Sequence, residues 1–376
     1  MDNQWGKIYG KTVSYSSATN YKENLDVMTK KVNDIMEEKL LKENLIGDNP
    51  LTVMFNNHEN HGKFMTNVFL LNDYELLEKS LNWVFSSYIA RGFSENYFKE
   101  VLSTWIQVIN LTLDIFAARE ITEVYYWMEN FYDEFDVNPI EEKKLSIKES
   151  PFEVVLKDKK NMLFSYLIEG DYKSSLELVK EIIHDKESLS NIYTKIIKEA
   201  MYDVGKAWEM GEISISQEHL ATSVISRIMA NIYMDYFILT EITKGKIIVT
   251  TATNEYHELG IRIVADLLEL DGWDVIYLGS NIPKEDLVKT ILKERPSFLV
   301  ISVTMAFNIS KAKEIIDEIK GNDDLRKLKI LAGGQAFNYF DNKSKIGADK
   351  ISLSVSETLD TAREWWKEAN GEGEEL

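Results

Sequence analysis

The chain contains no cysteine, which excludes disulfide bonds, iron–sulfur clusters, zinc sites with cysteine ligands and thiol nucleophiles. It also has no apolar run near the roughly 20 residues that span a bilayer, and its first residues lack the apolar segment of a signal peptide. We therefore expect a cytoplasmic protein without a membrane partner. Histidine is scarce too, so few soft metal ligands remain: His58, His61, His184, His219 and His257.

Basic residues are outnumbered. The 376 residues include 62 acidic and 43 basic side chains, for a formal net charge of -19. Phosphate contacts need clustered lysine and arginine, so we expect no direct nucleic-acid partner. Apolar residues make up 44% of the chain, which is enough for packed cores, and the length fits two or three domains.

The hydrophobic patterning changes along the chain and predicts three domains. Residues 1–140 carry aliphatic and aromatic side chains at helical spacing, which predicts an all-helical N-terminal domain of unknown role. The polar stretch 136–150 predicts a linker. Residues 150–240 predict four helices with short connections, arranged as a small cap bundle. In residues 244–370, β-branched runs alternate with helical patterns, which predicts a doubly wound, parallel five-stranded sheet of the flavodoxin-like or Rossmann-like type. The fold class is multi-domain, α and α/β.

The N-terminal histidines do not match a known metal pattern. His58-Glu59-Asn60-His61 is one residue shorter than the H-E-x-x-H pattern of zinc proteases. The neighbouring asparagines indicate a turn, so we expect a solvated loop there. The aromatic residues of this domain are expected to form its core rather than a chromophore pocket.

A short polar loop follows the first expected strand of the last domain. It contains Glu255, His257 and Gly260, and ligands of open α/β sheets bind beyond the carboxyl ends of the strands. Glu255 could accept the second ring N–H of His257, as carboxylates do for metal-bound histidines. A solvated loop histidine fits the pattern equally well. The glycine fingerprint for dinucleotides is missing, which argues against NAD or FAD.

Two further strand ends carry small residues. Ser302 ends the third expected strand, and Gly333 and Gly334 follow the fourth. Glycines there permit a large ligand to approach the backbone, although an ordinary turn explains the pair as well.

The order of histidine loop, strand-end serine and strand-end glycine pair resembles the cobalamin-binding Rossmann-like domain. The resemblance implies that His257 is the lower axial ligand of cobalt and that Glu255, where an aspartate is usual, is its partner. It also implies that the nucleotide tail of the cofactor passes Gly260 and enters a slot. The implied slot residues are Ser302, Gly333 and Gly334.

The bundle carries a second pattern, W-x9-E-H, formed by Trp208, Glu218 and His219. A core tryptophan and a solvated first helical turn would give the same residues. Placed before a cobalamin-like domain, the pattern resembles the light-sensing adenosylcobalamin proteins, typified by MerR-type repressors of carotenoid genes. The resemblance implies that Trp208 covers the upper ligand, that Glu218 hydrogen-bonds the adenosyl group, and that His219 supports this contact. Glu209 stands where the repressors have a histidine, which argues against a bis-histidine photoproduct.

Together these patterns favour a cobalamin-binding sensor, an adenosylcobalamin-dependent photoreceptor that acts through an unidentified regulatory protein partner. Homo-oligomerisation is an open option, and we expect a binding protein rather than an enzyme. The alternative is a corrinoid carrier protein of a methyltransferase system, for which methylcobalamin would be the cofactor. A carrier would need an open upper face and no W-x9-E-H pattern. An interaction protein with a degenerate site is disfavoured by the intact histidine motif, and a mutase by the lack of a barrel domain.

Overall fold

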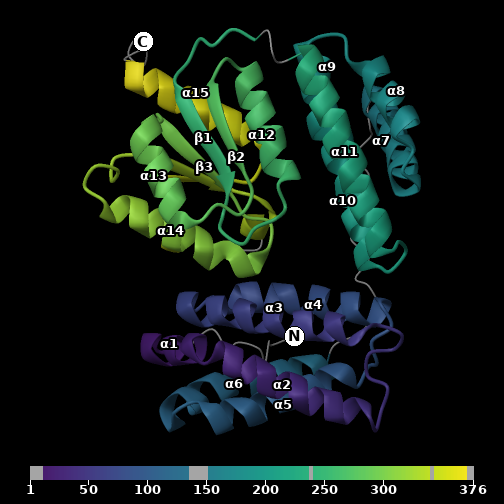
Figure 1. The fold of residues 1–376 in the computed structure, drawn as a ribbon, viewed down its shortest axis with the longest axis vertical. Coiled ribbons are helices and arrows are strands. Elements are labelled where there is room, and N and C mark those ends of the chain that lie inside the picture. The colour runs from purple at the N-terminus through teal and green to yellow at the C-terminus, as the bar shows by residue number, and fades with distance from the viewer. Residues whose placement is uncertain (1–11, 135–150, 237–239, 339–342, 371–376) are drawn as a thin grey trace. The chain divides into compact units, whose positions relative to one another are not determined.

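The structure is a computed structural model that describes residues 12–134, 151–236, 240–338 and 343–370 (Figure 1). Two compact units emerge from the contacts, namely residues 1–143 with 339–345, and residues 144–338 with 346–376. The predicted linker at 136–150 lies outside the described residues. Among the described helices, none combines the length and apolar character that crossing a membrane requires.

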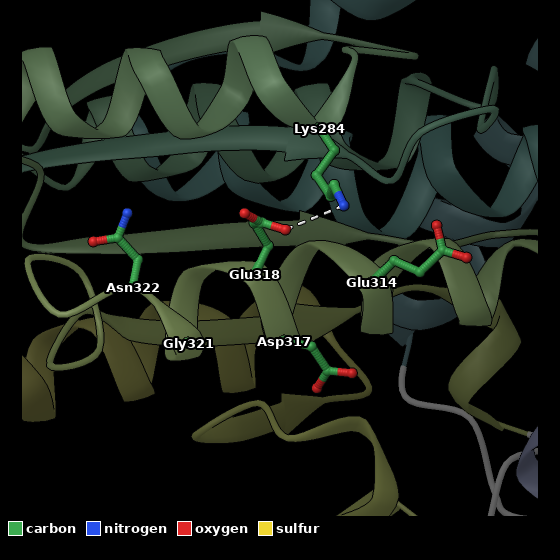
Figure 2. A pocket seen from close by; sticks show the side chains of 6 residues that line it. All are labelled: Lys284, Glu314, Asp317, Glu318, Gly321 and Asn322. Carbon is green, nitrogen blue, oxygen red and sulfur yellow. Dashed lines mark ion pairs between the residues drawn. The ribbon is translucent and has the colours of Figure 1, made fainter.

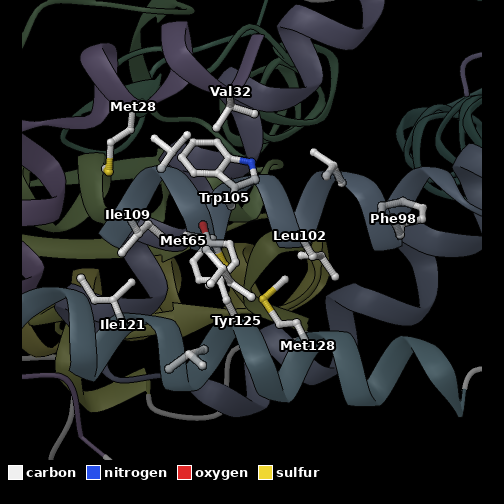
Figure 3. Close-up of a cluster of buried hydrophobic side chains, with 14 of the residues drawn as sticks. Met28, Val32, Met65, Phe98, Leu102, Trp105, Ile109, Ile121, Tyr125 and Met128 are labelled. Carbon is white, nitrogen blue, oxygen red and sulfur yellow. The ribbon is translucent and has the colours of Figure 1, made fainter. Parts of the chain in front are cut away.

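The first unit is helical, as its patterning predicts. Its helices are α1 (Tyr15–Glu23), α2 (Leu25–Leu40), α3 (Leu51–Leu71), α4 (Tyr74–Ala90), α5 (Tyr97–Thr112) and α6 (Ile115–Asp133). Side chains cap the N-termini of two of these helices. The carboxylate of Asp73 accepts a hydrogen bond from the backbone N–H of Leu76 at the start of α4, and that of Asp114 accepts one from the backbone N–H of Ala117 at the start of α6. Trp105 and Tyr125 are fully buried at the centre of the core and stack on each other at 6.2 Å (Figure 3). Most aromatic residues of this unit therefore form a core, as expected, whereas Trp83 and Tyr126 are 44% and 49% exposed and lie outside it.

The expectation of a solvated loop around His58 and His61 is wrong. Both residues lie within α3, on the stripe that also buries Met54 and Met65 at helical spacing. His58 is 2% exposed, and its Nδ1 donates to Asn33 Oδ1 at 2.6 Å. His61 Nε2 contacts the hydroxyl of Tyr125 at 3.0 Å. Burial lowers the pKa of His58 to about 3 and that of His61 to about 4, so both rings are neutral at pH 7.

The second unit begins with the predicted helical bundle. It comprises α7 (Pro151–Glu169), α8 (Tyr172–Ile182), α9 (Lys186–Asn191), the π-helix η2 (Ile192–Ile197), α10 (Lys198–Glu209) and α11 (Ile215–Tyr236). The three segments α9, η2 and α10 follow one another without a break and form a single helical run. Gly170 ends α7 with a φ of +73°, a conformation that suits glycine. The bundle therefore has four helical runs within the described residues.

The rest of the second unit is the predicted parallel sheet. Its strands are β1 (Lys246–Thr251), β2 (Asp274–Gly279), β3 (Phe298–Ser302), β4 (Lys329–Gly333) and β5 (Lys350–Ser352). The helices between and after them are α12 (Leu259–Leu270), α13 (Lys284–Glu294), α14 (Ile309–Gly321) and α15 (Val355–Asn370). All pairings are parallel and the strand order is β2-β1-β3-β4-β5, the flavodoxin-like order. The strand order reverses between β1 and β3, which is where such sheets bind ligands.

Helix α12 is shared by the sheet and the bundle. One side of the helix belongs to the core of the sheet, through Ile261, Val264, Ala265 and Leu268. Ile263 and Leu267 instead join the core of the bundle. The helix is therefore apolar on two sides, and it connects the bundle to the sheet.

Candidate functional site

The predicted histidine loop forms a hydrogen-bonded pair at the carboxyl end of β1. Glu255 is fully buried, and its Oε1 accepts from Nδ1 of His257 at 2.6 Å and from the backbone N–H of His257 at 3.1 Å. The His257 side chain is 58% exposed. Because Nδ1 donates to the carboxylate, Nε2 carries the lone pair and is the ring atom that can bind a metal. The hydrogen bond to Glu255 raises the pKa of His257.

The other oxygen of Glu255 is held by the loop that follows β3. Oε2 accepts from the backbone N–H groups of Thr304 at 3.0 Å and Met305 at 2.8 Å, and from Nδ2 of Asn308 at 3.1 Å. Burial alone would raise the pKa of Glu255, but the hydrogen bonds from His257, Met305 and Asn308 outweigh it and lower the pKa. The carboxylate is therefore charged, and it ties the loops after β1 and β3 together where the strand order reverses.

Asn308 is a site residue that the sequence patterns do not reveal. It is 3% exposed, and its Nδ2 also donates to the carbonyl of Asn254 at 3.1 Å. It therefore fixes both the carboxylate that holds His257 and the backbone of the same loop. In the sequence, Asn308 is marked only by its position six residues after Ser302, and that position by itself does not predict a contact with Glu255.

The loop after β2 supports the histidine loop from the other side. Asn281 Oδ1 accepts from the backbone N–H of Asn254 at 2.9 Å, and Asn281 Nδ2 donates to the hydroxyl of Tyr256 at 3.1 Å. Asn254 and Asn281 have φ values of 65° and 56°, in the left-handed region that asparagine tolerates better than most residues. The loop that carries His257 is thus fixed on both sides.

The predicted glycines differ in their surroundings. A Cβ placed on Gly260, at the start of α12, would meet no atom within 4 Å, so the space in front of it is open. A Cβ on Gly333 would lie 2.9 Å from the carbonyl oxygen of Ser352, and one on Gly334 would lie 2.3 Å from that of Val303. The backbone alone therefore requires glycine at 333 and 334. Their predicted role in a tail slot, with the 8% exposed Ser302, stays a prediction.

The bundle brings one of its predicted residues close to His257. Glu218, in the first turn of α11, contributes with its negative charge to the raised pKa of His257. Its Oε1 accepts from Thr222 at 2.9 Å, and its Oε2 lies 2.8 Å from Nδ1 of His219, whose side chain is 72% exposed. Trp208 is partly buried and packs against the bundle core. Contact of Trp208 or His219 with a cofactor stays a prediction.

A separate groove lies between α13 and α14 and does not match the predicted site (Figure 2). Its volume is about 610 Å³, and it is lined by Lys284, Glu314, Asp317, Glu318, Gly321 and Asn322. Lys284 pairs with Glu318 at 3.2 Å. Within the described residues, no group of three or more histidine, aspartate or glutamate side chains is arranged to hold a metal ion. The histidine loop is therefore the stronger candidate.

Two family models match the regions that form this site. Residues 245–363 match a B12 binding domain, and residues 160–233 match a second model that is also described as a B12 binding domain. The chain therefore contains a cobalamin-binding core built from the bundle and the sheet.

The similar proteins are corrinoid proteins. Dimethylamine corrinoid protein 1 of Methanosarcina mazei is 24% identical over 196 residues, which are 51% of this chain and 87% of the relative. The methanol–corrinoid protein of Methanosarcina barkeri is 31% identical over 96 residues, 26% of this chain and 36% of the relative. The solved structure of the monomethylamine corrinoid protein of Methanosarcina barkeri has a TM-score of 0.48 at 22% identity, covering 55% of this chain and 98% of that one.

These relatives contradict the photoreceptor interpretation. Their names refer to corrinoids and to dimethylamine or methanol, rather than to light or to gene regulation. The interpretation is wrong because W-x9-E-H places three side chains at helix ends but does not specify the upper ligand. A bundle followed by a sheet is compatible with either function, and W-x9-E-H, which we expected a carrier to lack, therefore does not separate the two functions.

Proposed function

We propose that the chain is a corrinoid carrier protein that binds methylcobalamin and exchanges its methyl group with methyltransferase partners. The observation that carries the proposal is the His257–Glu255 pair at the point where the strand order reverses, inside a matched B12 binding domain. The names of the relatives favour a methyl group over an adenosyl group as the native upper ligand.

The residues fit a corrinoid. An exposed imidazole with Nδ1 held by a buried carboxylate is a strong axial donor, because the hydrogen bond orients the ring and raises its basicity. The open space in front of Gly260 would let the nucleotide tail pass. When bound, the cobalt of the corrinoid supplies the centre that accepts and donates the methyl group.

The chain's own side chains would orient the cofactor rather than react. His257 would bind cobalt through Nε2, and Glu255 would keep the proton on Nδ1 so that the lone pair stays on Nε2. Glu218, Trp208 and His219 would contact the opposite face from the bundle. Ser302, with Gly333 and Gly334, would line the tail slot. The proposed functional core is thus residues 150–240 and 244–370, which lie in the second unit.

A binding and methylation experiment tests this proposal. The purified chain is titrated with hydroxocobalamin, reduced with titanium(III) citrate and mixed with ¹⁴C-iodomethane in the dark. We expect one equivalent of cobalamin and label that stays with the protein through gel filtration. His257→Ala should lose the absorption spectrum of the histidine-bound form, whereas Asn322→Ala, just beyond the C-terminal end of α14, should not. Failure to bind cobalamin, or bound cobalamin that takes no label, would contradict the carrier function.

A further inference from the structure

An exposed aromatic side chain lies beside the proposed cobalt ligand. Tyr256 stands between Glu255 and His257 and is 69% exposed, the largest exposed fraction of any large apolar side chain described in residues 244–370. Glu255 and His257 bind each other, and Tyr256 takes no part in that pair. Single exposed aromatic residues are common on protein surfaces, so the exposure assigns a role only together with what holds the side chain.

The hydroxyl of Tyr256 is attached to a frame of hydrogen bonds. It accepts from Asn281 Nδ2 at 3.1 Å, and Asn281 Oδ1 accepts from the backbone N–H of Asn254 at 2.9 Å. The backbone N–H of Asn281 donates to the hydroxyl oxygen of Thr251 at 3.1 Å. Thr251 is fully buried, and its hydroxyl donates in turn to the carbonyl of Glu255 at 2.9 Å. The loops after β1 and β2 together therefore fix the position of the Tyr256 side chain.

This arrangement holds the ring in one orientation while leaving it in water. Fixing a side chain costs conformational entropy, and the left-handed backbone of Asn281, with a φ of 56°, adds strain. The exposed hydrogen bond to Tyr256 offsets little of this cost, because water competes for both groups. A ligand that covers the ring binds more tightly because the ring is already ordered before the ligand arrives.

The ligand expected at this edge of the sheet is a corrinoid. Residues 245–363 match a B12 binding domain, and Nε2 of His257 is the ring atom that can bind cobalt. A corrin macrocycle is flat, extends well beyond its cobalt on every side, and carries methyl groups as well as amides at its edge. A macrocycle bound through His257 therefore extends over the residues next to it, and an ordered aromatic ring suits its apolar surface.

The strand order separates Tyr256 from the predicted tail slot. Tyr256 is tied to the loop after β2, whereas Ser302 and Gly333 end β3 and β4. In the order β2-β1-β3-β4-β5, these positions lie on opposite sides of β1. We propose that Tyr256 contacts the corrin macrocycle rather than the nucleotide tail, and that Asn281 positions its ring for that contact. The proposal rests on the cobalamin binding of the proposed function and is independent of methyl exchange.

Two variants of Tyr256 test the contact by titration with two corrinoids. Hydroxocobalamin carries the nucleotide tail, and aquacobinamide has the same macrocycle without it. If the bound macrocycle covers half of the ring, about 80 Å² of apolar surface leaves water, which corresponds to about 30-fold in Kd. Tyr256→Ala should therefore bind both corrinoids about 30-fold more weakly, whereas Tyr256→Phe keeps the ring and should stay within about fivefold of the wild type. Tyr126→Ala, which removes a tyrosine of α6 that is 49% exposed, is the control and should change neither Kd.

A chemical measurement on the wild-type chain tests the same contact without any substitution. Tetranitromethane nitrates exposed tyrosine rings, and the absence of cysteine removes its competing reaction with thiols. The full chain is nitrated in the dark, alone and saturated with each corrinoid, and the modified tyrosines are identified by peptide mass spectrometry. Tyr256 should be nitrated several-fold more slowly with either corrinoid bound, whereas Tyr126 should react at an unchanged rate.

Three titration results would overturn the proposal: wild-type affinities in Tyr256→Ala, a loss confined to hydroxocobalamin, which assigns the ring to the tail, or Tyr256→Phe as weak as Tyr256→Ala, which assigns the effect to the hydroxyl. If circular dichroism shows that Tyr256→Ala does not fold, the nitration decides, and Tyr256 that reacts equally fast with bound corrinoid overturns the proposal. A wild-type chain that binds cobalamin but takes no methyl label contradicts the carrier function alone. A wild-type chain that binds neither corrinoid contradicts both.

Discussion

Asn308→Ala is the perturbation that most directly tests how the histidine loop is held. The substitution removes two hydrogen bonds of 3.1 Å, one to the charged carboxylate of Glu255 and one to the carbonyl of Asn254. A bond to a charged group contributes about 1.5–3 kcal/mol and a neutral one about 0.5–1.5 kcal/mol. Glu255 keeps the two backbone N–H groups of Thr304 and Met305, and the exposed Asn254 can turn to water. The loss of both hydrogen bonds should therefore destabilise the ordered histidine loop by about 2 kcal/mol, near the lower end of the two ranges combined.

That cost should appear in cobalamin binding, because the loop must be ordered for His257 to bind cobalt. A cost of about 2 kcal/mol corresponds to a Kd about 30-fold weaker, within the range found for groups that orient metal ligands. Hydroxocobalamin is titrated by visible absorbance, and the protein is then reduced to the cob(II)alamin form, whose electron paramagnetic resonance shows nitrogen splitting from an axial histidine. Asn322→Ala is the control, since Asn322 caps the backbone of Asp324 outside the loop. A Kd within twofold of the wild type, with unchanged nitrogen splitting, would refute the reasoning.

The remaining predictions concern the glycines and the N-terminal core. Gly334→Ala should lower the thermal midpoint markedly, because Gly334 has a φ of +107° and a Cβ would lie 2.3 Å from the carbonyl oxygen of Val303; an unchanged midpoint would contradict the packing argument. Gly260→Ala should leave that midpoint nearly unchanged but weaken cobalamin binding in the same titration, and equal binding would remove Gly260 from the site. Trp105→Ala should cost about 3–5 kcal/mol in urea unfolding of the first unit, followed by circular dichroism, without affecting the cobalamin Kd. The His58 and His61 pKa values of about 3 and 4 lie below the unfolded value of about 6.5, so their stabilising effect is complete above pH 6.5 and declines as the pH falls. The free energy of unfolding in urea should fall by about 1.2 kcal/mol per pH unit for each of the two histidines between pH 6 and pH 4, and the double variant His58→Asn with His61→Asn should flatten that slope.

The sequence was most informative where a repeating pattern coincided with local chemistry. Alternating β-branched runs and helical stripes predicted the five strands and the bundle, because burial imposes those periods. Glu255 and His257 were found because they are two residues apart, so their contact is local. Asn308 was missed because it meets Glu255 only after β1 and β3 pair in register, a contact across 53 residues.

The two errors have different physical origins. His58 and His61 were assigned to a loop because asparagines beside them indicate turns, but the buried stripe through Met54 and Met65 outweighs that local preference. The photoreceptor interpretation failed because the upper ligand depends on the shape of the space above the corrin, which three side chains at helix ends do not determine. Periodicity and local spacing were therefore reliable guides here, whereas contacts made by the tertiary fold were not.

The π-helical segment η2 (Ile192–Ile197) sets the rotational position of the side chains of α10, which follows it in the same helical run. An α-helix advances about 100° per residue, so a turn with one extra residue rotates the later side chains by about that angle relative to α9. Trp208 lies on α10 beyond this turn and packs against the bundle core. Deleting one residue from the π-helical turn would restore the regular phase and rotate Trp208 by about 100° relative to Leu189, the buried residue of α9. The side of the helical run on which Trp208 lies relative to Leu189 is thus set more than two turns before it, at the π-helical segment.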